Sequence, residues 1–138
     1  MASYLAGIAI CVAGVGAVHA LAHTVGGIHS IGHGVANSIF LPAVMKFNGD
    51  SRREKFTKMA LLLGESTEGP DVETAAERAV RALTKDLGIP QRLRELGVSR
   101  EDLGPIGNRC LATQDRILAN NPRKVDPESA AALLNQVY

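Results

Sequence analysis

The first third of this chain carries no formal charge. Residues 1–45 contain no Lys, Arg, Asp or Glu, so all 15 basic and all 14 acidic side chains lie downstream. The same uncharged stretch also holds every histidine of the chain: His19, His23, His29 and His33. A buried polar ring without a partner is costly, and a metal ion is one partner that suits neutral imidazole. Segment 17–37 is therefore the candidate site, and the rest of the chain is expected to be its scaffold.

Length and composition favour a single helical domain over residues 1–138. The apolar residues are mainly Ala, Leu, Val and Ile, and aromatic residues make up only 4%, which suits packed helices better than a β-sandwich. A net charge of +1 argues against a nucleic-acid partner, which would require a basic face. Cys11 and Cys110 are too few for a disulfide framework, so we expect reduced thiols and a cytoplasmic protein.

The N-terminal segment is expected to form one helix over residues 3–23, buried on all sides and ended by Gly26-Gly27. Gly7, Gly14 and Gly16 lower its helix propensity, and their expected use is the close approach of another backbone. Residues 1–22 are also long enough to span a bilayer. They lack the positively charged start of a signal peptide, and no basic residue precedes Lys46 to anchor a transmembrane helix. We therefore expect a helix buried inside the protein and no membrane partner.

Downstream, start and stop signals predict further helices and no strand. Gly34–Asn48 is expected to be helical, with a kink at Pro42. Other expected starts are a Ser51–Glu54 capping box, an Asp71 cap, a Ser99–Asp102 cap before a helix near 103–117, and Asp126-Pro127 before a helix over 130–137. Gly64 and Gly88 mark expected ends. The fold class is all-α, with about six to seven helices.

Spacing alone limits what the histidines can do. His19 and His23 are four residues apart, so a helix places them on one face, where they can chelate one metal ion. A zinc-protease helix would need Glu after the first histidine, but Ala20 stands there. His29 and His33 are also four apart, in or near the expected loop. We infer a metal or catalytic role for at least two of the four, and spacing does not decide which two.

Residues 7–48 resemble a long motif of the iron-containing alcohol dehydrogenase family. The motif has the form GxxHxxxHxxGxxxxxxHGxxN, followed by Leu-Pro and by Val-Met-x-Phe/Tyr-Asn. This chain matches it at Gly16, His19, His23, Gly26, His33, Gly34, Asn37, Leu41, Pro42 and Val44 to Asn48. The stretches DLGIPQRLRELGVSREDL and NPRKVDPESAAALLNQVY also look like the C-terminal part of that family. The resemblance implies that this chain is the helical metal-binding domain of that family, a helical bundle of the dehydroquinate synthase-like type.

The resemblance also implies a role for each histidine. His19 and His33 match two of the family's metal ligands, which hold Fe²⁺ or sometimes Zn²⁺. His23 matches the histidine beside the nicotinamide and the substrate, which implies a catalytic role in proton transfer and contact with NAD(P). His29 falls where the family often has an aromatic residue, so it is expected to line the cofactor pocket. Thr24 replaces a common proline, which should matter little for ligation.

The family's other two ligands, spaced Asp-x-x-x-His, have no counterpart, because no histidine lies outside residues 19–33. A glycine-rich cofactor loop is missing as well, since Gly14-Val15-Gly16 lies in an apolar helix. We therefore expect the metal-binding half of an oxidoreductase acting on small alcohols and aldehydes, inactive by itself and prone to form homo-oligomers through apolar helix surfaces. Two alternatives stay open: a non-catalytic binding or assembly module, and a small membrane-associated metal-binding protein.

Overall fold

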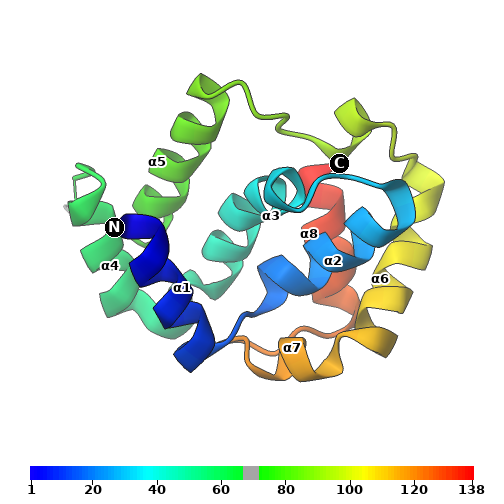
Figure 1. The fold of residues 1–138 in the computed structure, drawn as a ribbon, viewed down its shortest axis with the longest axis horizontal. Coiled ribbons are helices and arrows are strands. Elements are labelled where there is room, and N and C mark those ends of the chain that lie inside the picture. Colours follow the sequence, from blue (N-terminus) through cyan, green and yellow to red (C-terminus); the bar gives the residue numbers. More distant parts are fainter. Residues whose placement is uncertain (67–71) are drawn as a thin grey trace.

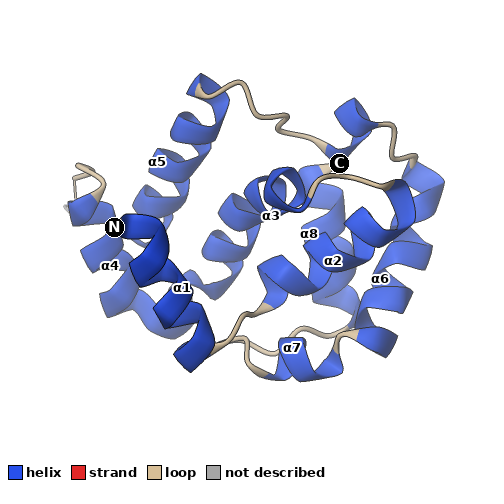
Figure 2. Cartoon of the chain, viewed as in Figure 1, coloured by secondary structure: helices blue, strands red, loops and turns tan. Residues whose placement is uncertain are grey.

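The computed structural model describes residues 1–66 and 72–138, and all regular elements within these residues are helices (Figures 1 and 2). The all-α prediction is confirmed. The α-helices are α1 (Ala2–Ala13), α2 (Ala17–His29), α3 (His33–Asn48), α4 (Arg53–Leu62), α5 (Val72–Asp86), α6 (Leu103–Thr113), α7 (Asp115–Ala119) and α8 (Pro127–Val137). Three short 3₁₀ turns join them: η1 (Gly49–Arg52), η2 (Leu93–Leu96) and η3 (Arg100–Asp102).

The main core forms where α2 and α3 pack against α6 and α8. In Figure 1, α3, α6 and α8 lie around α2. Its largest fully buried side chains are Phe40, Leu21, Leu93, Ile106, Leu134, Val25 and Cys110. A smaller apolar cluster joins α3 to α4 and α5 through Met45, Phe56, Ala60, Ala75 and Ala76. Helices α2 and α3 thus supply the centre of the fold, and the charged helices α6 and α8 pack against them.

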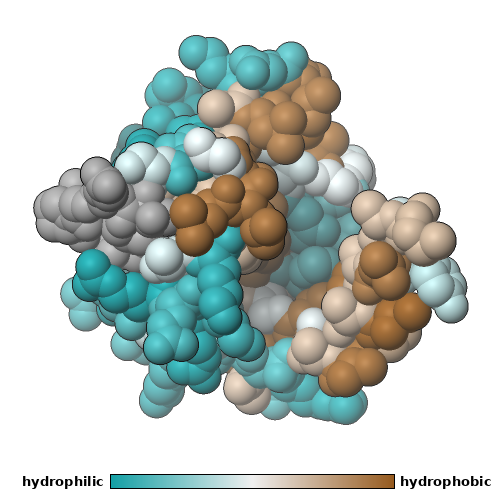
Figure 3. Space-filling view, turned by 90° about the vertical axis from the view of Figure 1, so that its left-hand side faces the viewer, coloured by the Kyte–Doolittle hydropathy of each residue, from teal (hydrophilic) through white to brown (hydrophobic). Residues whose placement is uncertain are grey.

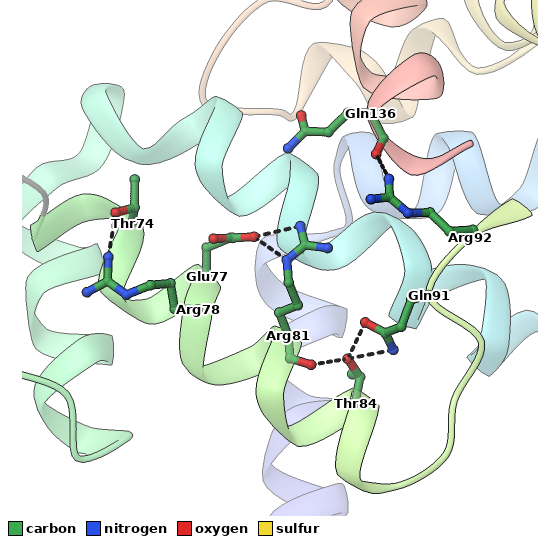
Figure 4. A network of polar contacts seen from close by, with 8 residues as sticks. All are labelled: Thr74, Glu77, Arg78, Arg81, Thr84, Gln91, Arg92 and Gln136. Carbon is green, nitrogen blue, oxygen red and sulfur yellow. Dashed lines mark hydrogen bonds and ion pairs between the residues drawn. The ribbon is translucent and has the colours of Figure 1, made fainter.

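Polar contacts attach α5 to the segment that follows it (Figure 4). Arg81 Nε donates to Glu77 Oε1 at 2.7 Å along the helix, and Gln91 Nε2 donates to Thr84 Oγ1 at 3.3 Å across the turn. Farther on, an Arg92 guanidinium nitrogen donates to the backbone carbonyl of Gln136 in α8. The chain after α5 is thereby tied to the helices of the main core.

The single buried helix expected over residues 3–23 is wrong. The chain bends by 100° between α1 and α2, and Gly14 ends α1 at φ +70°, a backbone conformation that favours glycine. None of the residues of α1 is buried, and Tyr4, Leu5 and Val12 are largely exposed. Only the second half of the expected helix, in α2, reaches the core.

Three smaller expectations also differ from the structure. α2 continues through Gly26-Gly27 and ends at Ser30, which adopts the left-handed conformation at φ 55°. Ser51 does not cap α4, because its hydroxyl donates to Asn48 O and places the residue in η1. The helix expected over 103–117 is interrupted at Gln114, which separates α6 from α7.

Other sequence signals are confirmed. Ser99 and Asp102 form a reciprocal capping box, and Asp126 caps α8 through Ser129 with Pro127 at its first turn. Gly64 and Gly88 both adopt positive φ just after helix ends. The cap expected at Asp71 lies outside the described residues.

Within residues 1–66 and 72–138, no single helix has both the length and the apolar content needed to cross a bilayer. Only the bent pair of α1 and α2, taken together, meets that length and composition.

Candidate functional site

Three of the four histidines meet at the junction of α2 and α3. His19 and His23 lie one turn apart on α2, and His33 is the first residue of α3. The ring centroids are 5.8 Å apart for His19 and His23, 5.3 Å for His19 and His33, and 5.1 Å for His23 and His33. The structure therefore brings together the two predicted metal ligands and the predicted catalytic histidine.

The histidines reach each other because α2 is anchored in the core on the opposite face. Ala20, Leu21 and Val25 are fully buried or nearly so, while His19 is half-buried and His23 is exposed. A four-residue spacing repeats on one side of a helix, so the imidazoles share the side that the core leaves open. The short connection after His29 then starts α3 with His33 beside them.

The surroundings of His19 favour its neutral form. Burial lowers the pKa of His19 below its ordinary value, and His33 and His23 lower it further because positive charges on neighbouring imidazoles repel. Metal ions bind the neutral ring, so a lowered pKa leaves His19 available as a ligand at neutral pH.

Asn37 contacts His33 within α3. Its amide nitrogen lies 2.8 Å from His33 Nε2, and its amide oxygen is buried without a hydrogen-bond partner among the described residues. The motif carries this asparagine one turn after His33, and the contact holds the exposed ring in place. Sequence reasoning quoted Asn37 but gave it no role, although its four-residue spacing from His33 was a usable signal.

His29 lies apart from the other three imidazoles. Its Nε2 is 3.7 Å from Asp102 Oδ2, too long for a hydrogen bond, and is otherwise buried without a partner among the described residues. Hydrogen bonds from Ser99 hold the pKa of Asp102 below its ordinary value, with a smaller contribution from His29. His29 thus faces the start of α6, and its expected role in lining a cofactor pocket stays a prediction.

The described residues do not contain three His, Cys, Asp or Glu groups already arranged around one ion position. Two imidazoles are close enough to share one. A ring centroid lies about 3.2 Å from a metal bound at the usual Zn–N distance, so the 5.3 Å between the His19 and His33 rings lets both reach one ion. This separation is compatible with two positions of a four-ligand set.

A pocket of about 490 Å³ opens directly beside His19, in the bend between α1 and α2. Ile10 and Val15 line it from the N-terminal side, and Ser38 and Leu41 line it from α3. Asn120 and Asn121, from the loop after α7, complete its wall. Its size is typical of small-molecule sites, and His19 is the one histidine among the described residues that line it.

The fold and the site define a helical domain that gathers imidazoles next to a small-molecule pocket. Residues 1–138 match the Fe-containing alcohol dehydrogenase family, C-terminal. The chain belongs to this family.

Individual relatives are alcohol-converting enzymes. The chain is 41% identical over 140 residues to "1,3-propanediol dehydrogenase" of Klebsiella pneumoniae, covering 99% of this chain and 36% of that protein. It is 38% identical over 136 residues to "NAD-dependent methanol dehydrogenase" of Bacillus methanolicus, covering 96% and 35%. A crystal structure of 1,3-propanediol oxidoreductase superposes with a TM-score of 0.83 at 38% identity, covering 91% of this chain and 33% of that one. The chain thus spans about a third of the length of the relatives it matches.

Proposed function

We propose that this chain is the helical metal-binding part of an iron-dependent alcohol dehydrogenase that transfers hydride between a primary alcohol or aldehyde and NAD(P). The observation that carries the proposal is the 5.3 Å separation of the His19 and His33 rings beside a small-molecule pocket. The names of the relatives support a small alcohol as substrate and a nicotinamide as cofactor. Because the chain spans about a third of their length, the whole enzyme's activity is part of the proposal.

In this mechanism His19 and His33 would hold the metal, Fe²⁺ or Zn²⁺, with two further ligands from outside residues 1–138. A divalent ion held there would supply Lewis-acid chemistry for the oxidation of the alcohol, with the nicotinamide as the hydride acceptor. Asn37 would hold the His33 ring in its orientation from the neighbouring turn. The lowered pKa of His19 keeps that ring in the neutral form that binds metal ions.

His23 would move the proton. It lies one turn from His19, and its ring stacks on His33 with the centroids 5.1 Å apart. A substrate hydroxyl beside His19 and His33 would therefore also be near His23. The side chain is exposed, which lets it pass a proton on to water. The apolar residues of the adjacent pocket, including Ile10 and Leu41, would bind the carbon chain of the alcohol and exclude water from it.

A hybrid enzyme tests the proposal. The matching C-terminal 36% of the Klebsiella pneumoniae relative is replaced by this chain, and NAD-dependent oxidation of 1,3-propanediol is measured. We expect turnover that is lost in His19→Ala and His33→Ala hybrids and sharply reduced in His23→Ala. The control is Asn135→Ala, because the amide of Asn135 donates within its own helix. A folded hybrid that stays inactive, or keeps its activity without His19, would contradict the proposal.

The isolated chain should neither oxidise alcohols nor stay strictly monomeric. α1 exposes Tyr4, Leu5, Ile8 and Val12, and Figure 3 shows hydrophobic areas around a hollow on the side of the molecule where α1 and α4 lie. Exposed apolar surface of this kind promotes association, so we propose a homo-oligomer through these helices. A monomeric elution profile at high concentration would count against it. Turnover by the 138-residue chain, abolished by His23→Ala, would refute its expected inactivity.

A further inference from the structure

We propose that Asn121 is a positioning residue for His19: its side chain caps the N-terminus of α2 from the far end of the chain, and Gly16 is the residue that admits it. Asn121 and Ala17 are 104 positions apart in sequence. The proposal rests on the proposed function only where it treats His19 as a metal ligand. Its structural part concerns the metal-free chain.

The cap replaces a side chain that α2 lacks. A helix leaves its first four backbone N–H groups without helical partners, and Ser, Thr, Asp or Asn at the N-cap position normally accepts from one of them. The N-cap of α2 is Gly16, which has no side chain. Instead, Ala17 N donates to Asn121 Oδ1 at 3.2 Å. The first turn of the histidine-bearing helix is therefore closed by the loop between α7 and α8.

Asn121 is itself held in one orientation. Asn48 Nδ2 donates to Asn121 Oδ1 at 3.1 Å, and Asn121 Nδ2 donates back to Asn48 Oδ1 at 2.9 Å and to Arg123 O at 2.7 Å. Asn48 is buried and is the last residue of α3, the helix that begins with His33. The same side chain thus joins the two helices that carry the predicted metal ligands.

Gly16 is needed for this contact and not for its backbone conformation. Its φ of −126° lies outside the left-handed region that favours glycine. A Cβ added there would lie 2.9 Å from Asn121 Oδ1, closer than side chains approach. The glycine that opens the family's histidine motif therefore leaves room for the cap.

The neighbouring asparagine fixes the other side of the bend. Asn120 Nδ2 donates to Ala13 O at 2.7 Å and to Val15 O at 3.2 Å, and a Cβ on Gly14 would lie 2.8 Å from that nitrogen. Loss of the cap would let the first turn of α2 fray. His19 lies in that turn, whereas His23 lies one turn farther along, so His19 is the histidine that would move.

Nuclear magnetic resonance of the imidazole nitrogens in the metal-free chain tests this directly, with signals assigned from single His→Gln variants. We expect Asn121→Ala to shift the His19 signals and leave those of His29 unchanged. The control is Asn135→Ala, since the amide of Asn135 donates only within its own helix, to Ala131 O. Unchanged His19 signals in Asn121→Ala would overturn the proposal.

A double-mutant cycle tests the contact even where a single variant unfolds easily. In the wild-type background, we expect Gly16→Ala to lower the ratio of folded to unfolded chain by about tenfold. In the Asn121→Ala background the loss should be less than about twofold, because Asn121 Oδ1, which the new Cβ would meet, is gone. Equal losses in both backgrounds, measured by urea unfolding, would overturn the proposal.

Titration of the same variants with Zn²⁺ separates this proposal from the proposed function. If the cap positions a ligand, Asn121→Ala should weaken binding by about tenfold, as loss of a supporting residue does at metal sites. Suppose that the wild-type chain binds no Zn²⁺, while Asn121→Ala still changes the chemical shifts of His19. That result would refute the proposed function and leave the proposed cap intact. Unchanged binding and unchanged His19 signals in Asn121→Ala would refute the cap alone.

Discussion

Deletion of residues 1–13 from the isolated chain should hardly change its stability. Removing α1 takes away no buried residue. Two hydrogen bonds of the described residues cross the boundary, from Asn120 to Ala13 O and from Gly14 N to Ile10 O; the second only ends α1 itself, and a hydrogen bond contributes about 0.5–1.5 kcal/mol net. A 12-residue helix without packing is only marginally stable in water. We therefore expect the free energy of unfolding to fall by about 1 kcal/mol.

The opposite case is numerically distinct. If α1 packed as a core helix, three of its large apolar side chains would be buried at about 1.5–3 kcal/mol each, and deletion would cost more than about 5 kcal/mol. Urea unfolding followed by circular dichroism separates the two values. Leu134→Ala shows that the assay responds, because Leu134 is only 1% exposed and truncation of such a residue costs about 2–5 kcal/mol. A loss above about 3 kcal/mol, or a non-cooperative transition, would refute the reasoning.

Three further outcomes follow from individual side chains. The pKa of His19 is lower in the folded chain than in the unfolded chain, so the unfolded chain binds a proton at His19 more readily. The contribution of His19 to stability should therefore be complete above its unfolded pKa and be lost as the pH falls through its folded pKa. His19→Gln should flatten this acid-side loss in urea unfolding curves between pH 7 and 5. Asp126→Ala should lower the melting temperature and Asp126→Asn should not, since either side chain can accept from Ser129 N, the bond that caps α8; equal melting temperatures would argue against the cap. Burial raises the pKa of the Cys110 thiol, so in a Cys11→Ser chain, which lacks the exposed thiol, Cys110 should react with a thiol reagent only after unfolding. Rapid native-state labelling of that variant would contradict the buried position of Cys110.

The sequence contained enough to predict the class of fold. Helix stops at Gly64 and Gly88 and caps at Asp102 and Asp126 are local signals, because each depends on residues within one turn. The grouping of His19, His23 and His33 followed from the motif, which assigns the roles by resemblance. The structure adds that the three rings are neighbours.

The bend between α1 and α2 was not predictable from local pattern. The chain there is uniformly apolar, so no periodicity distinguishes a buried helix from an exposed one, and the glycines alone did not show where the break falls. Its tertiary contacts lie more than 100 residues away, in Asn120 and Asn121. A single sequence gives no sign of the contact of these two residues with Gly14 and Gly16. The neighbour of His29, Asp102, is likewise distant in the sequence.

The central claim is that His19 and His33 form half of a metal ion's ligand set. Calorimetric titration of the 138-residue chain with Zn²⁺ at neutral pH tests it most directly, with the His19→Ala, His33→Ala and His29→Ala variants measured alongside. We expect weak binding, with a dissociation constant above the micromolar range. Binding should disappear in His19→Ala and His33→Ala and persist in His29→Ala. Submicromolar affinity, or binding that His19→Ala and His33→Ala leave unchanged, would contradict it.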